Sequence, residues 1–420
     1  MSNNLRHNGC HTLMLGFDYE LRRRGFAGNS CQIVLELSTA IDPLRLEQRL
    51  AELARQHPIL RSRPARGLNL MPCWKPTCTM PRVRVHANAN DLPQQLFNEP
   101  LNIRRGELIR FDLIGRTLFF TWNHALMDAK SAEYFLALAG GDKMPFPELG
   151  EDWYAQRATR VSGLRARRRQ AWRELERLDQ FQTALPISLA TRRQPVTRTM
   201  KYQVVALSRE DSARVRAHAG RLCGFLGDTN FHTAATLLEL HRLHERAGCP
   251  SASYVLPIPI GLRPKGTRGP LFSNQVTMML HQFLPAHLAS PEQAIAAVKT
   301  RNMEYLRDEH INPGIVLAQM FRGLPLPLYM RLIKHELRGE ICSLFFGDTG
   351  TVDSALQSFL GAAIEKFAHV PAVTVPPGAG VVFYRFLDQL QFTLIHADGT
   401  LTDNEATEFA ARLRERLLNA

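Results

Sequence analysis

Short β-favouring runs alternate with amphipathic helical segments along most of this chain of 420 residues. Residues 32–37 have the alternating pattern of a strand, and residues 202–207 also have the composition of a strand. Residues 230–246, in contrast, are strongly helical. Strand and helix signals mixed in this order predict an α/β protein in which mixed sheets are faced by helices.

The length and the apolar content of the chain predict two lobes. Hydrophobic residues make up 45% of the sequence, which is enough for two ordinary domain cores. An arginine-rich segment, residues 155–182, is expected to form one connecting helix. We therefore predict an N-terminal lobe over residues 1–178, which includes most of that helix, and a C-terminal lobe over residues 179–420.

The segment around residue 124 is the strongest candidate for a functional site. An apolar, β-favouring run over residues 118–122 ends at Asn123 and His124, and Asp128 follows four positions later. This places an imidazole where a strand runs into a loop or a helix start, which is where catalytic groups often lie. The alternative is a partly buried histidine that is hydrogen-bonded to a nearby aspartate.

This segment resembles the H-H-x-x-x-D-G-x-S signature of the chloramphenicol acetyltransferase-like superfamily. That superfamily includes peptide-synthetase condensation domains and many acyl-CoA-dependent acyltransferases. His124 matches the second histidine, Asp128 the aspartate and Ser131 the serine. Asn123 replaces the first histidine and Ala129 replaces the glycine. If the loop needs a positive φ or a close backbone approach at that position, alanine would distort it.

Further segments extend the resemblance over nearly the whole chain. Residues 55–61 resemble the R-H-E-x-L-R segment of condensation domains, and residues 258–275 resemble the paired "L-R-P" and "G-x-x-x-N" segments. Residues 343–347 and 391–402 resemble a later strand end and the last strand with its closing helix. The resemblance implies two chloramphenicol acetyltransferase-like lobes arranged as a V, with the active-site channel between them.

The resemblance also implies roles for individual residues. His124 would act as the general base, and Asn274 or Ser343 would stabilise the oxyanion from the second lobe. Asp128 belongs to the same motif and would form a structural ion pair, with Arg61 as the first candidate partner and Arg263 as the second. Removal of a buried partner would leave an unpaired charge and impair folding.

The implied activity is that of an acyltransferase for groups other than aminoacyl groups. The donor would be a thioester of coenzyme A or of the phosphopantetheine arm of an acyl-carrier protein, and the acceptor a small alcohol or amine. No permanently bound cofactor is expected. Two alternatives remain open: a condensation-type enzyme that forms amides in nonribosomal peptide synthesis, and a degenerate scaffold that binds carrier proteins without catalysis. No motif in the sequence identifies the acyl group, the acceptor or the pathway.

Positive charge is concentrated in the predicted connector. The formal net charge of the chain is +13, and eight arginines lie between residues 157 and 177. These residues could form a solvated helix face, or they could attract phosphates and carboxylates of a donor. The second interpretation assigns donor or carrier docking to Arg165, Arg167, Arg168 and Arg169. Nucleic acid is not expected, because no DNA-binding motif accompanies the cluster.

Other site types find little support in the sequence. His232, His241 and His244 could share a metal only with further ligands, so no metal site is predicted. The seven cysteines are scattered and form no C-x-x-C pair, which argues against a disulfide framework. No apolar run is long enough to cross a bilayer or to form a signal peptide, so a soluble, cytoplasmic protein is expected.

Overall fold

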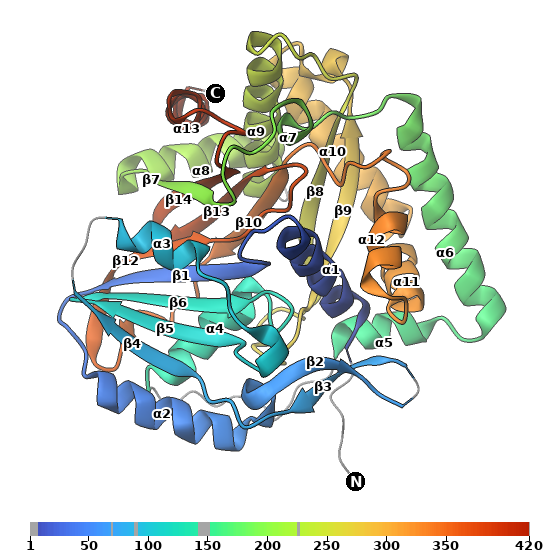
Figure 1. Cartoon of the computed structure of the whole chain (residues 1–420). Helices are drawn as coiled ribbons and strands as arrows, with labels where there is room; N and C mark the ends of the chain where they lie inside the picture. Colours follow the sequence, from blue (N-terminus) through green and yellow to red (C-terminus); the bar gives the residue numbers. More distant parts are fainter. Residues whose placement is uncertain (1–6, 69, 88–90, 142–151, 225–226, 420) are drawn as a thin grey trace.

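The computed structural model describes residues 7–68, 70–87, 91–141, 152–224 and 227–419. Two mixed sheets, each faced by helices, form two lobes that lie one above the other in Figure 1. Each sheet combines one parallel strand pair with antiparallel pairs. The α/β architecture predicted from the sequence is therefore confirmed.

The first lobe is built on a six-stranded sheet. Its strands, in spatial order, are β11 (Ser358–Phe359), β12 (Ala362–Val370), β1 (Ser30–Leu37), β6 (Thr117–Asn123), β5 (Ile109–Ile114) and β4 (Arg82–His86). Its other elements are α1 (Gly9–Arg23), α2 (Pro43–Gln56), η1 (Pro58–Arg61), β2 (Ser62–Arg66), β3 (Pro72–Pro76), α3 (Leu92–Asn98), η2 (Ile103–Arg105) and α4 (Ala129–Ala139).

The second lobe contains a four-stranded sheet and a long two-stranded ladder. The sheet order is β10 (Phe345–Thr351), β13 (Ala379–Phe386), β14 (Gln389–Ala397) and β7 (Met200–Ala206), and the ladder pairs β8 (Tyr254–Gly261) with β9 (Val276–Phe283). The surrounding helices are α7 (Leu189–Arg192), α8 (Arg209–Cys223), α9 (Gly227–Arg246), η4 (Pro285–Leu288), α10 (Pro291–Arg307), α11 (Ile311–Phe321), α12 (Leu326–Ile333) and α13 (Asp403–Leu418).

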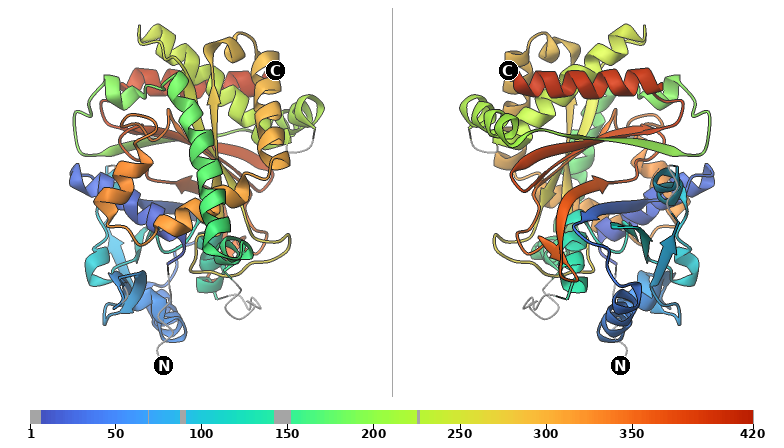
Figure 2. Two further views of the ribbon diagram at one scale, coloured as in Figure 1. Left: turned by 90° about the vertical axis from the view of Figure 1, so that its right-hand side faces the viewer. Right: turned by 90° about the vertical axis from the view of Figure 1, so that its left-hand side faces the viewer.

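The connector between the lobes differs from its prediction. Instead of one helix over residues 155–182, it forms α5 (Trp153–Arg160), α6 (Leu164–Asp179) and η3 (Gln180–Thr183). The break falls at Gly163, whose φ of 83° is in a region that suits glycine and ends regular helix. Figure 2 shows α6 running along the outside of the molecule.

The sheet of the first lobe includes strands from the second half of the sequence. β12 comes from the second half of the sequence, yet it pairs with β1 in the first lobe's sheet, with Ile33 opposite His369. The predicted boundary at residues 178/179 therefore divides the sequence but not the sheets. Buried apolar side chains fill both lobes, including Ile33, Phe120 and Phe135 in the first and Leu240, Phe383 and Leu394 in the second.

No helix in the described part of the chain is both long enough and apolar enough to cross a bilayer.

Candidate active site between the lobes

A cavity of about 380 Å³ lies where the two sheets and the β8–β9 ladder meet. The first lobe contributes α1, the end of β6 and the start of α4, and the second lobe contributes β10 and β13. Most of the wall surface is apolar, and its polar residues include His124, His369, Asp128, Lys130 and Asp348. An apolar hollow with a few placed polar groups is the usual form of a small-molecule site.

His124 lies at the first position after β6. Its backbone N–H donates to the Asn29 carbonyl at 2.9 Å, so the loop continues the pairing of β6 with β1. The half-buried ring lines the cavity, and its Nδ1 is buried without a hydrogen-bond partner. Burial lowers the pKa of His124 below its usual value, although nearby carbonyl groups and the charge of Asp128 oppose this shift. The ring is therefore favoured in its neutral form.

Asn123, at the position of the motif's first histidine, is fully buried and supports the loop. Its side-chain nitrogen donates to Asp18 at 2.9 Å, and its side-chain oxygen accepts from the Ala125 N–H at 3.1 Å. Asp18 in turn accepts from the Asn29 N–H at 2.9 Å. Asn123 thus holds the turn that carries His124 and does not face the cavity.

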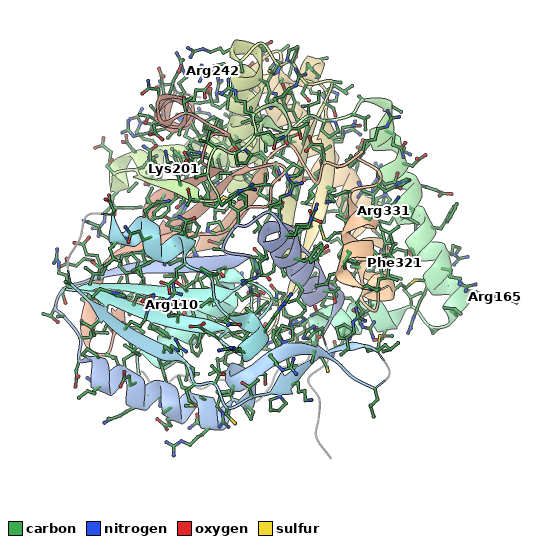
Figure 3. All side chains as sticks on the ribbon, in the orientation of Figure 1. Arg110, Arg165, Lys201, Arg242, Phe321 and Arg331 are labelled. Carbon is green, nitrogen blue, oxygen red and sulfur yellow. The ribbon has the colours of Figure 1, made fainter. Side chains whose placement is uncertain are left out.

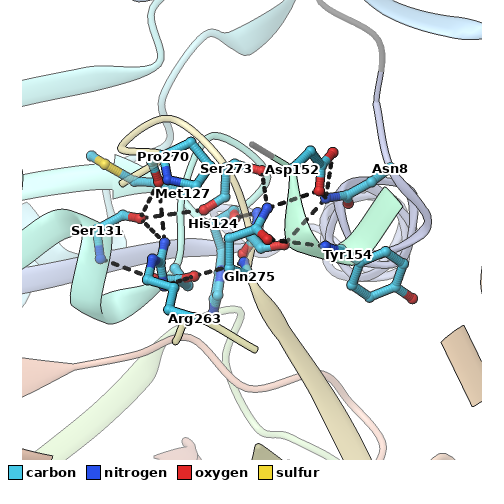
Figure 4. A network of polar contacts seen from close by, with 12 residues as sticks. Asn8, His124, Met127, Ser131, Asp152, Tyr154, Arg263, Pro270, Ser273 and Gln275 are labelled. Carbon is cyan, nitrogen blue, oxygen red and sulfur yellow. Dashed lines mark hydrogen bonds and ion pairs between the residues drawn. The ribbon is translucent and has the colours of Figure 1, made fainter. Parts of the chain in front are cut away.

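The connection between β8 and β9 crosses from the second lobe and holds the same turn from the other side (Figure 4). The Asn274 side-chain nitrogen donates to the carbonyls of His124 at 2.9 Å and Ala125 at 3.3 Å. These two contacts occupy the N–H donors that an oxyanion would need. Among the described residues, Asn274 is not one of those that line the cavity. The structure therefore places Asn274 as a support of the His124 loop.

Asp128 turns away from His124 and pairs with Arg263 on this crossing segment. The Arg263 Nη1 lies 2.9 Å from Asp128 Oδ2, and the Gln275 N–H donates to the same oxygen at 2.8 Å. Burial alone would raise the pKa of Asp128, but the Arg263 charge and the N–H donors of Ser131 and Gln275 hold it below its usual value. Of the two expected partners, Arg263 is present. Among the described residues, no ion pair joins Arg61, the first choice, to Asp128.

Asp128 also explains why a helix begins directly after the motif. Its Oδ1 accepts from the Ser131 N–H at 2.8 Å, which caps α4. The Ser131 hydroxyl accepts from Arg263 and lies within hydrogen-bond distance of the Pro270 and Ser273 carbonyls. Ala129 occupies the first helical position, and its φ is not left-handed. The glycine of the motif is therefore not required here for backbone conformation.

Ser343, the other expected oxyanion donor, lies outside the cavity lining. Its hydroxyl accepts from the Val255 N–H at 2.9 Å, and its own N–H donates to the Val255 carbonyl at 2.8 Å. The side chain is 1% exposed. Ser343 joins its segment to β8 and is not placed to donate to a carbonyl in the cavity.

The arginines assigned to donor docking lie on α6, away from the cavity lining. Figure 3 shows Arg165 at the outer edge of the molecule. Arg165, Arg168 and Arg169 are exposed, whereas Arg167 is half-buried and its Nε donates to the Val161 carbonyl at 3.0 Å. The cluster is thus an external surface, and nothing in these contacts assigns it a ligand.

The three histidines considered as metal ligands have separate partners. His232 Nδ1 lies 2.9 Å from Asp348, His241 Nδ1 lies 2.9 Å from the Tyr254 hydroxyl, and His244 Nδ1 lies 3.0 Å from the Cys249 carbonyl. Among the described residues, no three His, Cys, Asp or Glu side chains are grouped as a metal would need.

Sequence reasoning missed several residues of the site. Gln275 and Asn8 both contact Asp152, at 2.9 Å and 3.3 Å, and thereby join the crossing segment to the N-terminus. His369 reaches the cavity from β12. Gln275 ends the segment of residues 258–275 that was identified by resemblance, whereas Asn8 and His369 stand in no motif. All three make contacts with residues more than 100 positions away. The β-strand pattern around His369 was the only available signal for that residue.

Comparison of the sequence with family models and with curated proteins gives no match. Solved structures do match over essentially the whole chain. The first condensation domain of the calcium-dependent antibiotic synthetase has a TM-score of 0.70 at 15% identity, covering 99% of this chain and 97% of that one. TRI3 trichothecene 15-O-acetyltransferase from Fusarium sporotrichioides has a TM-score of 0.67 at 13% identity, covering 98% and 95%.

A third similar structure is the epimerization domain from the third module of tyrocidine synthetase B. Its TM-score is 0.62 at 12% identity, and the match covers 100% of this chain and 96% of that one. The chain therefore has the two-lobed chloramphenicol acetyltransferase-like fold of condensation domains. Because an epimerization domain shares it, this fold does not by itself fix the reaction.

Proposed function

We propose that this protein is an acyltransferase in which His124 is the general base. The observation that carries the proposal is the placement of the His124 ring: it lines an inter-lobe cavity, and its loop is held by hydrogen bonds from both lobes. The donor is a thioester of coenzyme A or of an acyl-carrier protein, and the acceptor is an alcohol or an amine.

The chemistry follows from a neutral imidazole beside an activated carbonyl. His124 accepts the proton of the acceptor O–H or N–H while the acceptor oxygen or nitrogen forms a bond to the thioester carbon. The tetrahedral intermediate then expels the thiolate, which takes the proton back from the imidazolium. Burial lowers the pKa of His124, so a larger fraction of the ring is neutral near pH 7.

Asn274 and Asp128 serve this base as positioning residues. The Asn274 side-chain oxygen and His124 Nδ1 are both buried without a hydrogen-bond partner. The Asn274 side chain also favours the protonated ring, so it opposes the fall in the pKa of His124 that burial causes. It is therefore the available acceptor for Nδ1–H, which would leave Nε2 free to act as the base. The Asp128–Arg263 pair holds the start of α4 against the crossing segment.

Docking of the donor is assigned to the exposed arginines of α6. Arg165, Arg168 and Arg169 lie on one side of the helix at three- and four-residue spacing, where they can bind phosphate oxygens. This assignment is supported by charge alone. If the assignment is correct, substitution of all three arginines by glutamine should raise KM for a carrier-bound donor without changing kcat.

The first test is thiol release from a panel of acyl-coenzyme A and acyl-carrier thioesters, with mixed alcohols and amines as acceptors. We expect acceptor-dependent release in the wild type and a loss of about 10²- to 10⁴-fold in His124→Ala. Products from amines only would favour the condensation-type alternative. A folded protein that binds carrier but releases no thiol with any donor would instead support the non-catalytic scaffold.

A further inference from the structure

A second histidine lines the same cavity at some distance from His124. His369 lies near the end of β12, and β1 separates β12 from β6 in the sheet. Ser30 is opposite Asn123 and Ile33 is opposite His369, so the two histidines are offset along β1 as well as across it. Strand geometry puts their Cα atoms roughly 15 Å apart. His369 therefore lies at a different position along the cavity from His124.

His369 is held by a buried carboxylate. Its Nε2 lies 3.1 Å from Glu133 Oε1, and Glu133 is 0% exposed. The other Glu133 oxygen accepts from Lys130 Nζ at 2.8 Å and from the Asp353 N–H at 3.2 Å. The ring packs edge-on against Phe367 and Tyr384, with centroid separations of 4.9 and 5.5 Å. Position and orientation of this imidazole are therefore fixed.

The carboxylate also determines which nitrogen can act on a ligand. The Glu133 carboxylate, which also accepts from Lys130, is an acceptor for His369, so Nε2 is the ring nitrogen that donates to it. In the neutral ring Nδ1 then carries the lone pair and is a hydrogen-bond acceptor. The neighbouring cavity wall is largely apolar, with Phe345, Val373 and Val382.

We propose that His369, oriented by Glu133, is a specificity-determining residue that accepts a hydrogen bond from a hydroxyl or N–H group on the substrate, remote from the reacting carbonyl. This inference rests on the proposed acyl transfer. The substrate that fits His369 is a mostly apolar chain with one hydrogen-bond donor at a distance from the reacting carbonyl. The donor group could belong to the acyl chain or to the acceptor, since both share this chemistry.

The test compares matched substrate pairs. Acyl thioesters of graded chain length are assayed with and without a terminal hydroxyl, and apolar acceptors are assayed in the same paired way. A buried acceptor left unpaired costs about 1–3 kcal/mol, so one pair should show a preference of about 5- to 150-fold in kcat/KM for the hydroxylated member. The series that shows the preference identifies which substrate carries the donor group.

Two variants of His369 keep the test interpretable. His369→Phe should abolish the preference, so that kcat/KM for the hydroxylated member falls to the value for the plain member. His369→Gln, which can still donate to Glu133, guards against misfolding and should weaken the preference. Equal losses for both members of a pair would mean that His369 is only structural, and a wild type without any preference would equally overturn the inference.

Binding of non-hydrolysable thioether analogues, measured by calorimetry, separates this inference from the proposed function. A hydroxyl-dependent affinity that disappears in His369→Phe would support the recognition role even if His124→Ala leaves turnover unchanged. Equal affinities for the two analogues, together with His124-dependent turnover, would leave the acyltransferase in place and reject the role of His369.

Discussion

Two histidine–aspartate combinations lie on opposite sides of the cavity, and they are built differently. In the first lobe Asp128 gives its oxygens to Arg263 and to backbone N–H groups, and no hydrogen bond joins it to His124 in the described chain. In the second lobe Asp348 is 2.9 Å from His232 Nδ1. Of these two histidines, only the one that does not line the cavity, His232, pairs directly with its aspartate.

The surroundings of His232 explain this difference. The side chain is 1% exposed, and its ring stacks on Phe383 at 4.3 Å between centroids. Burial alone would raise the pKa of Asp348, but the hydrogen bond and charge of His232 hold it below its usual value. His232 therefore stabilises the carboxylate of Asp348, which itself lines the cavity. A His–Asp pair in a structure is not evidence of a catalytic dyad unless the ring can reach a ligand.

The same substitution at His124 and at His232 should have different effects. His124→Gln should lower kcat/KM by about 10²- to 10⁴-fold with little change in stability, since it removes a base at the cavity wall. His232→Gln should instead lower the free energy of unfolding by about 1–3 kcal/mol and leave most activity, because it weakens support for Asp348. Steady-state kinetics and urea unfolding measure the two effects. A catalytic loss in His232→Gln equal to that in His124→Gln would reverse the assignment.

The second prediction concerns the aspartate that is not paired with its histidine. Asp128→Ala leaves Arg263 as an uncompensated, nearly buried charge and removes the cap of α4, so it should cost about 3–5 kcal/mol of stability. Chemical unfolding measures this loss. The double variant Asp128→Ala/Arg263→Met removes both charges and should recover part of it. If the double variant is no more stable than the single one, the ion pair is not what holds the loop.

The fold could be predicted from the sequence because the patterns of its strands and helices are local. The contacts within the candidate site could be predicted only in part. The strand that ends at Asn123 and the helix capped by Asp128 are encoded in adjacent residues. The choice between Arg61 and Arg263 depends on where the β8–β9 connection crosses, and sequence spacing does not carry that information. Asn274 and Ser343 were found by resemblance, but their actual hydrogen bonds depend on packing between distant segments.

The pH dependence should separate the two members of the motif. A base must be neutral, and burial lowers the pKa of His124, so the acid limb of kcat/KM should lie below about pH 6.5. Asp128 has a folded pKa below its unfolded value, so its stabilising contribution is present above about pH 4 and is lost as the pH falls toward the folded pKa. The stability difference between wild type and Asp128→Asn should accordingly shrink in acid. An acid limb well above pH 6.5 would contradict the base assignment.

The smallest expected effect comes from restoring the motif's glycine. Ala129 has an ordinary φ at the first position of α4, and the structure gives no reason for glycine there. Ala129→Gly should therefore leave kcat/KM within about twofold and lower the stability by no more than about 1 kcal/mol, through the added backbone entropy of glycine. Thermal unfolding and the thiol-release assay measure both quantities. Ala129 and His124 both line the cavity. A large gain in activity would therefore mean that the Ala129 methyl group obstructs the substrate beside His124 and lowers the activity of the wild type.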